Sequence, residues 1–173
     1  MRRVILLRHA KSSWADVGQQ DFDRPLNPRG RRAAAAVGAW LAGQDIRPDA
    51  ALVSAAQRTR ETWSLLGPAF AEAPVTFRPD LYHAESSALL RTLRGAPADA
   101  ETVMVVGHQP GIGETAVRLL PDAPEDPDYL RYPTAAVAVI DFDVDDWDAL
   151  AWGAGRLHAF ATPARLDTSA RLE

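Results

Sequence analysis

The chain of 173 residues has the length of one ordinary domain. Its composition, with 47% hydrophobic and 24% charged residues, excludes a disordered or fibrous protein. A formal net charge of -4 excludes a broad positive field for nucleic acid, and the absence of cysteine excludes disulfides, thiolate nucleophiles and cysteine metal sites. We therefore expect one cytoplasmic domain over residues 1–173 that binds neither nucleic acid nor a membrane.

Short apolar strands and amphipathic helices alternate along the chain. The first strand, at 4–7, is continuously apolar, as in strands covered on both faces, and is too short for a signal-peptide core or a membrane span. A long loop at 10–26 follows, and Asn27-Pro28 then predicts a helix that ends at Gly43. Its predicted buried face comprises Ala33, Ala36, Val37, Trp40 and Leu41.

The rest of the chain repeats this alternation. Further strands are expected at 50–53, 75–77, 102–106, 135–142 and 149–160. A helix is expected after Ser54, with Trp63, Leu66 and Phe70 at helical spacing. A second is expected to start at Ser86 or Ser87 and to bury Leu89, Leu90 and Leu93. A third is expected to follow the turn 107–111 and to end near Leu120. The proline-rich segment 121–133 is predicted to be a loop.

This alternation predicts an α/β fold of three layers, α/β/α, in which helices cover both faces of a mainly parallel sheet. The last two strands are expected to form an antiparallel edge. Ligands bind beyond the carboxyl ends of the strands in such sheets. The segments at those ends are 8–14, 54–62 and 107–113.

Each of these segments carries a cationic or titratable side chain at or near a strand end: Arg8 and His9, then Arg58, then His108. Converging guanidinium groups and a helix N-terminus favour a phosphoryl group, whose oxygens accept paired hydrogen bonds. The chain has no cysteine and no serine in a nucleophile elbow, so histidine is the natural nucleophile.

The same motifs resemble those of a known family. Leu7-Arg8-His9-Ala10, the segment 54–62 and Gly107-His108 resemble, in order, the motifs of the histidine phosphatase (phosphoglycerate mutase-like) superfamily. The segment 8–14 and Arg24-Pro25-Leu26 are similar to the SixA-type branch, the phosphohistidine phosphatases. The resemblance extends from residue 4 to about 163.

The resemblance implies a role for each residue. His9 would be the nucleophile that becomes phosphohistidine, Arg8 and Arg58 would clamp the phosphoryl oxygens, and His108 would stabilise the developing charge. We expect the positive groups to hold His9 neutral, and we expect no metal and no cofactor. Ala10 and Ala55 depart from the wider family, which usually has glycine and proline there.

The chain has no clear match to the carboxylate that protonates the leaving oxygen in many members. Glu85 is the nearest candidate, followed by Asp80 and His83. An alkoxide leaves poorly without a proton donor, whereas phosphohistidine can leave as neutral imidazole. We therefore expect phosphohistidine on a protein to be the substrate.

Two alternatives remain open at this point. The protein could be a phosphomonoesterase for a small metabolite, or a non-catalytic module that binds a phosphorylated protein. A mutase is disfavoured because no extra segment is available to enclose a bisphosphate. The sequence leaves the oligomeric state open.

Several other residues have ordinary structural interpretations. Lys11 could face the phosphate or only solvent. Trp14 is expected to pin the long loop to the core, with a position at the mouth of the site as the alternative. His83 and His158 are interpreted as structural. The acidic stretch 141–148 lacks the glycine and glutamate of a calcium loop and predicts a solvated hairpin turn.

Overall fold

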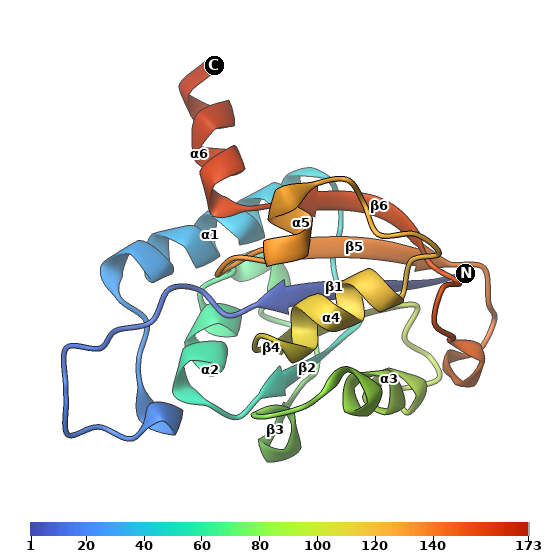
Figure 1. Ribbon diagram of the computed structural model, residues 1–173, viewed down its shortest axis with the longest axis horizontal. Helices are drawn as coiled ribbons and strands as arrows, with labels where there is room; N and C mark the ends of the chain where they lie inside the picture. The colour runs from blue at the N-terminus through green and yellow to red at the C-terminus, as the bar shows by residue number, and fades with distance from the viewer. Residues whose placement is uncertain (173) are drawn as a thin grey trace.

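The computed structural model describes residues 1–172 and has a six-stranded mixed sheet with helices packed on it (Figure 1). The strand order is β3-β2-β4-β1-β5-β6, in which β1 to β4 pair in parallel and β5 and β6 form an antiparallel edge. The strands are β1 Arg2–Arg8, β2 Ala50–Ser54, β3 Val75–Arg78, β4 Thr102–Gly107, β5 Val137–Phe142 and β6 Arg156–Ala161. The predicted α/β fold with its antiparallel edge is confirmed.

In the described part of the chain, six α-helices accompany the sheet. They are α1 Pro28–Gly43, α2 Gln57–Ser64, α3 Ser86–Arg94, α4 Gly111–Arg118, α5 Pro127–Arg131 and α6 Pro163–Leu172. Short 3-10 helices lie at Asp21–Asp23, Pro68–Phe70, Pro79–Leu81 and Trp147–Ala149. Within residues 1–172, no helix has the length and apolar character that a membrane crossing needs.

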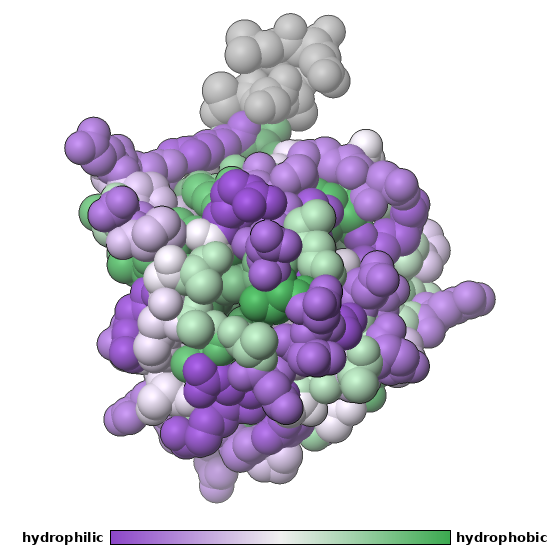
Figure 2. Space-filling view, turned by 90° about the vertical axis from the view of Figure 1, so that its right-hand side faces the viewer, coloured by the Kyte–Doolittle hydropathy of each residue, from purple (hydrophilic) through white to green (hydrophobic). Residues whose placement is uncertain are grey.

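The alternation of side chains along β1 divides the core into two parts. Val4 and Leu6 join the cluster that packs against α3, α4 and α5, whereas Ile5 and Leu7 join the cluster under α1 and α2. All four are fully buried, so β1 is covered on both faces. On the face shown in Figure 2, hydrophilic residues surround smaller apolar patches, as expected when most large apolar side chains are buried.

The start of α1 follows from its local sequence. The side chain of Asn27 accepts a hydrogen bond from the Gly30 amide at 2.8 Å, and Pro28 occupies the first helical position. The fully buried apolar side chains are those of Ala34, Val37 and Leu41, so the buried face lies slightly to one side of the predicted one.

Five features differ from the sequence-based expectation. The segment 121–133 contains α5, because Asp126 caps the helix and Pro127 starts it. The helix after Ser54 ends at Ser64, because Gly67 and Pro68 break the helical pattern before the separate turn that holds Phe70.

The other three differences concern the C-terminal third. The second edge strand begins at Arg156 instead of 149, since the 3-10 helix Trp147–Ala149 buries Trp147 first, and α6 follows the edge strands. The acidic stretch is only partly solvated: Asp141 is buried and pairs with Arg3 at 2.6 Å.

Candidate active site

The ends of β1 and β4 bring two histidines together. Arg8 lies opposite Gly107 in the parallel register, and the His9 amide donates to the Gly107 carbonyl at 3.0 Å. The rings of His9 and His108 follow directly, with their centroids 5.2 Å apart. A pocket of about 270 Å³, called the His9 pocket below, is lined by Arg8, His9, Lys11, Ser12, Trp14, Arg24, Arg58, His108, Gln109 and Thr134. All four residues singled out in the sequence therefore face one pocket.

The orientation of His9 is fixed by a carbonyl group. Its Nδ1 lies 2.8 Å from the Ala10 carbonyl oxygen. Because a carbonyl only accepts hydrogen bonds, Nδ1 carries the proton and Nε2 keeps its lone pair. The Ala10 amide in turn donates to Thr62 Oγ1 at 3.0 Å, and this hydroxyl donates to the Arg58 carbonyl at 2.7 Å. Thr62 thus ties the first motif to the second.

His9 is neutral at physiological pH. Burial lowers the pKa of His9 to about 3; the bond to the Ala10 carbonyl opposes this shift, and the charges of Arg58, Arg8 and Arg24 add to it. The sequence-based expectation credited nearby positive charge alone, whereas desolvation is the larger cause. The ring nitrogen Nε2 is therefore available as a nucleophile.

The guanidinium groups of the two predicted arginines are each held by hydrogen bonds to other parts of the chain. Arg8 Nη1 donates to the Tyr132 carbonyl at 3.1 Å, and Arg58 Nη1 and Nη2 donate to the carbonyl and carboxylate of Asp21 at 2.7 and 3.0 Å. Arg58 is only 6% exposed, which excludes its interpretation as a surface helix residue. The Nε atoms of both arginines are buried, and neither has a hydrogen-bond partner among residues 1–172.

His108 is held by the end of β2. Its Nε2 lies 2.8 Å from Ser54 Oγ, which also accepts from the Ala56 amide at 3.4 Å, so the serine hydroxyl proton is free to point at Nε2. Its Nδ1 is buried and has no partner within the described chain. Burial, then the proximity of His9 and Arg58, lowers the pKa of His108 to about 3.

The sequence-based analysis missed a third arginine of the site. Arg24 is 6% exposed and lines the His9 pocket, with Nη1 donating to Ser12 Oγ at 2.7 Å and Nε donating to Asp21 Oδ1 at 3.0 Å. The only sequence signal for it was the similarity of Arg24-Pro25-Leu26 to the SixA-type branch. No periodic pattern marks a single residue inside a long loop.

Trp14 is placed differently from the sequence-based expectation. Its side chain is 69% exposed at the rim of the His9 pocket, and the Arg24 guanidinium lies 3.5 Å from the centre of its ring. It covers an arginine of the site and does not pin the loop to the core, because the loop is instead tied down by the Leu26 amide, which donates to Glu61 at 3.0 Å. Lys11 is exposed and lines the same pocket.

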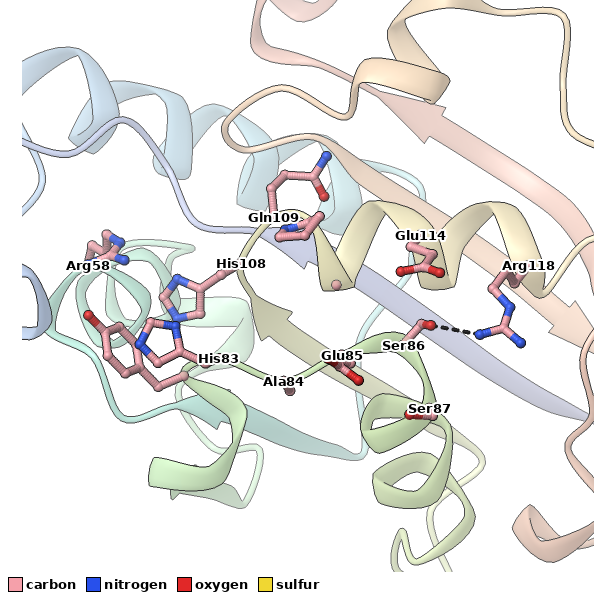
Figure 3. Close-up of a pocket in the computed structure, with 13 residues that line it drawn as sticks. Arg58, His83, Ala84, Glu85, Ser86, Ser87, His108, Gln109, Glu114 and Arg118 are labelled. Atoms are coloured by element: carbon pink, nitrogen blue, oxygen red, sulfur yellow. Dashed lines mark hydrogen bonds between the residues drawn. The ribbon is translucent and has the colours of Figure 1, made fainter.

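A second cavity of about 700 Å³ opens beyond His108 (Figure 3). Tyr82 and His83 form its aromatic wall, with ring centroids 3.9 Å apart, and Glu85 and Ser86 come from the start of α3. Glu114 and Arg118 face it from α4.

The three candidate proton donors lie outside the His9 pocket. Glu85 is exposed and lines the second cavity, where the exposed His83 stacks on Tyr82. Asp80 is exposed and pairs with Arg78 at 2.6 Å. Elsewhere, His158 lies in β6, 3.7 Å from Asp141. Among the described residues, no group of three or more histidine or carboxylate side chains could hold a metal ion.

Comparison with known sequences identifies relatives of the chain. Residues 4–86 match the histidine phosphatase superfamily (branch 1). An uncharacterized protein of Mycobacterium tuberculosis (strain ATCC 25618 / H37Rv) is 34% identical over 139 residues, which cover 78% of this chain and 85% of that protein.

Comparison with solved structures identifies similar proteins whose names refer to phosphohistidine phosphatases. A structure named "Putative Phosphohistidine Phosphatase SixA" from Nakamurella multipartitia is 35% identical with a TM-score of 0.81, and the match covers 94% of this chain and 96% of that one. The protein of the same name from Agrobacterium tumefaciens is 32% identical with a TM-score of 0.76, over 94% of this chain and 98% of that one. With its motifs, fold and relatives in agreement, the chain belongs to branch 1 of the histidine phosphatase superfamily, and its structural neighbours include SixA proteins.

Proposed function

We propose that this protein is a phosphatase that passes a phosphoryl group through His9 to water, and that phosphohistidine on a protein is its preferred substrate. The observation that carries the proposal is the state of His9. Its Nε2 lone pair is free because Nδ1–H is bound to the Ala10 carbonyl, and it lies in a pocket lined by three arginines.

In the first step, His9 Nε2 attacks phosphorus and the bond from phosphorus to the leaving nitrogen breaks. The electron pair of that bond goes to the substrate imidazole, which leaves neutral when its other nitrogen already carries a proton. The new phosphohistidine ring keeps its Nδ1 proton, and the Ala10 carbonyl oxygen stabilises the positive charge that the ring gains.

In the second step, water attacks phosphorus and the bond to Nε2 breaks, so that His9 regains its lone pair. The proton lost by the water passes to a phosphate oxygen. Arg8, Arg24 and Arg58 stabilise the charge on the phosphoryl oxygens in both steps, and His108 donates from Nδ1 when Ser54 donates to its Nε2. Anchored donors of this kind need little reorganisation during the reaction.

The missing proton donor supports phosphohistidine as substrate. Among the described residues, no carboxylic acid lines the His9 pocket. A leaving alkoxide needs a proton, whereas a phosphorylated imidazole protonated on its other nitrogen does not. The names of the Nakamurella and Agrobacterium neighbours agree with this choice of substrate.

One observation favours a second candidate, a phosphomonoesterase for a small metabolite. The second cavity adjoins His108 and presents the carboxyl groups of Glu85 and Glu114. If a small alkyl phosphate placed its leaving oxygen there, Glu85 could protonate it. In that case Glu85→Gln lowers kcat on the alkyl phosphate and leaves turnover of phosphohistidine unchanged.

The proposal is tested by comparing turnover of a histidine-phosphorylated protein and of an aryl phosphate, at neutral pH with a chelator present. We expect phosphohistidine to be favoured, and His9→Ala to lose activity at least about a thousandfold. His158→Ala, a histidine variant in β6 away from the pocket, should match the wild type. Circular dichroism should show that His9→Ala keeps its fold, because His9 follows β1 and lies outside the two apolar clusters.

Each outcome has a distinct meaning. Activity that depends on His9 but favours a small ester would redirect the substrate search to metabolites. Activity retained by His9→Ala would refute the mechanism. Phosphate binding without turnover on either substrate would support a non-catalytic phosphoprotein-binding module.

A further inference from the structure

Asp21 lies at the centre of a hydrogen-bond cluster beside the His9 pocket. It belongs to the 3-10 helix Asp21–Asp23, within the long loop that follows His9. Its Oδ1 accepts from Arg24 Nε at 3.0 Å, and its Oδ2 accepts from Arg58 Nη2 at 3.0 Å. The Asp21 carbonyl also accepts from Arg58 Nη1 at 2.7 Å, and the Tyr82 hydroxyl donates to Oδ2. One residue therefore contacts two of the three arginines of the pocket.

The contacts join an exposed carboxylate to buried cations. The side chain of Asp21 is 45% exposed, whereas those of Arg24 and Arg58 are 8% and 7% exposed. The hydroxyl of Tyr82, followed by the two arginines, holds the pKa of Asp21 well below its usual range. Asp21 is therefore a charged acceptor at neutral pH, and it is unsuited to donate a proton to a leaving group.

Asp21 does not use every donor of Arg58, which also lines the His9 pocket. Asp21 uses two of the five N–H groups of Arg58, and the buried Nε–H of Arg58 has no partner among residues 1–172. Asp21 offsets only one of the three positive charges of Arg8, Arg24 and Arg58, and Lys11 lines the same pocket, so a positive field remains for a phosphoryl group.

The cluster also reaches the second histidine of the site. The ring of Tyr82 packs edge-on against His108, with centroids 5.5 Å apart, and the Arg58 guanidinium lies 5.7 Å from the centre of the same ring. Fixing the Tyr82 hydroxyl to Asp21 therefore limits how far this ring can move against His108.

We propose that Asp21 is a positioning residue that orients Arg24, Arg58 and Tyr82 so that their free faces meet the phosphoryl group in the transition state. This inference rests on the proposed phosphatase function, and it assigns to Asp21 no contact with substrate. Its energetic basis is preorganisation, since small displacements of groups that stabilise a transition state can lower rates by about a hundredfold.

Two simpler roles predict different behaviour. If Asp21 only weakened the positive field, its neutralisation would tighten anion binding and leave kcat unchanged. If Asp21 occupied the arginines as an internal competitor of substrate, its neutralisation would raise activity. The positioning role alone predicts that kcat falls while phosphate still binds.

The experiment compares Asp21→Asn with Asp23→Asn, which makes the same change of charge at an exposed residue of the same 3-10 helix. Turnover is measured with the phosphohistidine protein, and the Kd of inorganic phosphate is measured by calorimetry. We expect kcat of Asp21→Asn to fall at least about tenfold, with the Kd of phosphate unchanged or lower, and Asp23→Asn to match the wild type. An unchanged or raised kcat in Asp21→Asn would overturn the proposal, as would an equal loss in Asp23→Asn.

A second measurement needs no substrate. The Nε–H signals of Arg24 and Arg58 are recorded by ¹H–¹⁵N NMR and assigned through their loss in Arg24→Lys and Arg58→Lys. In Asp21→Asn we expect faster proton exchange at Arg24 Nε, because its acceptor is weakened. An unchanged exchange rate at Arg24 Nε would refute the positioning role. A wild type that is inactive on every phosphate would refute only the proposed function, because the exchange measurement does not depend on turnover.

Discussion

Trp14 and Arg24 form a stacked pair at the rim of the His9 pocket. One face of the Arg24 guanidinium is covered by the exposed indole ring, and its edges donate to Ser12 and Asp21. The stacking limits the motion of a long side chain that would otherwise lose much conformational entropy when it binds a phosphoryl group. We therefore expect the ring to contribute to phosphate binding, although it is 69% exposed.

We predict that Trp14→Ala raises the KM for an aryl phosphate about two- to fivefold, because a cation–π contact at an exposed site contributes about 0.5–1 kcal/mol. Trp14→Phe keeps an aromatic face and should lose less. Val17→Ala changes another exposed residue of the same loop and serves as the control. Steady-state kinetics test the prediction, and equal KM values for Trp14→Ala and the wild type would contradict it.

At the scale of elements, α1 packs unusually close to the segment after α2. A Cβ atom added at Gly38 would lie 1.7 Å from the Leu66 carbonyl oxygen, which is backbone and cannot rotate away. The buried face of α1 is thereby held against the sheet beside α2, the helix that carries Arg58. The close approach helps to fix the position of this arginine.

Gly38→Ala is expected to lower the free energy of unfolding by at least about 2 kcal/mol, since the added methyl group overpacks against fixed backbone. Gly43→Ala is the matched control at the end of the same helix, where nothing lies within 4 Å of the added atom. That variant should lie within about 1 kcal/mol of the wild type, on the stabilising side. Urea denaturation measures both, and similar stabilities for the two variants would refute the packing argument.

At the scale of the whole molecule, the fold buries two neutral histidines at one edge of the sheet. The pKa values of His9 and His108 are about 3 in the folded protein, against an ordinary value of 6.5. Between these values the unfolded chain binds protons that the folded chain does not bind. The free energy of unfolding therefore falls as the pH falls from about 6.5 towards 3.

We predict that this coupling lowers the free energy of unfolding by about 2 kcal/mol per histidine between pH 7 and pH 5. Replacing either residue, in His9→Gln or His108→Gln, should make the pH dependence correspondingly shallower. Denaturant titrations at the two pH values provide the measurement. A wild type that is equally stable at pH 5 and pH 7 would show that the histidines are not buried in their neutral form.

The sequence alone determined the alternation of strands and helices up to α4 and the placement of three motifs at strand ends. Continuous apolar runs such as 4–7 and 102–106 predict buried parallel strands, and the carboxyl ends of such strands meet at one edge. This rule places His9 and His108 at the same edge of the sheet, whereas the pairing of β1 with β4, which brings their rings to 5.2 Å, was decided by the tertiary structure. The family resemblance added the expected roles of Arg8 and Arg58, and the match of residues 4–86 together with the similar SixA structures confirms the family.

Only the tertiary structure placed Asp21 beside the site, showed what Arg24 contacts there and decided between the two positions considered for Trp14. They lie in a loop with no hydrophobic periodicity, and the conformation of that loop depends on contacts with distant parts of the chain, such as the bond from the Leu26 amide to Glu61 on α2. The low pKa of His9 was likewise decided by burial, which depends on packing around the pocket. Local sequence patterns report which residues point towards a core, whereas hydrogen bonds between loops and buried cations form only when the whole chain has folded.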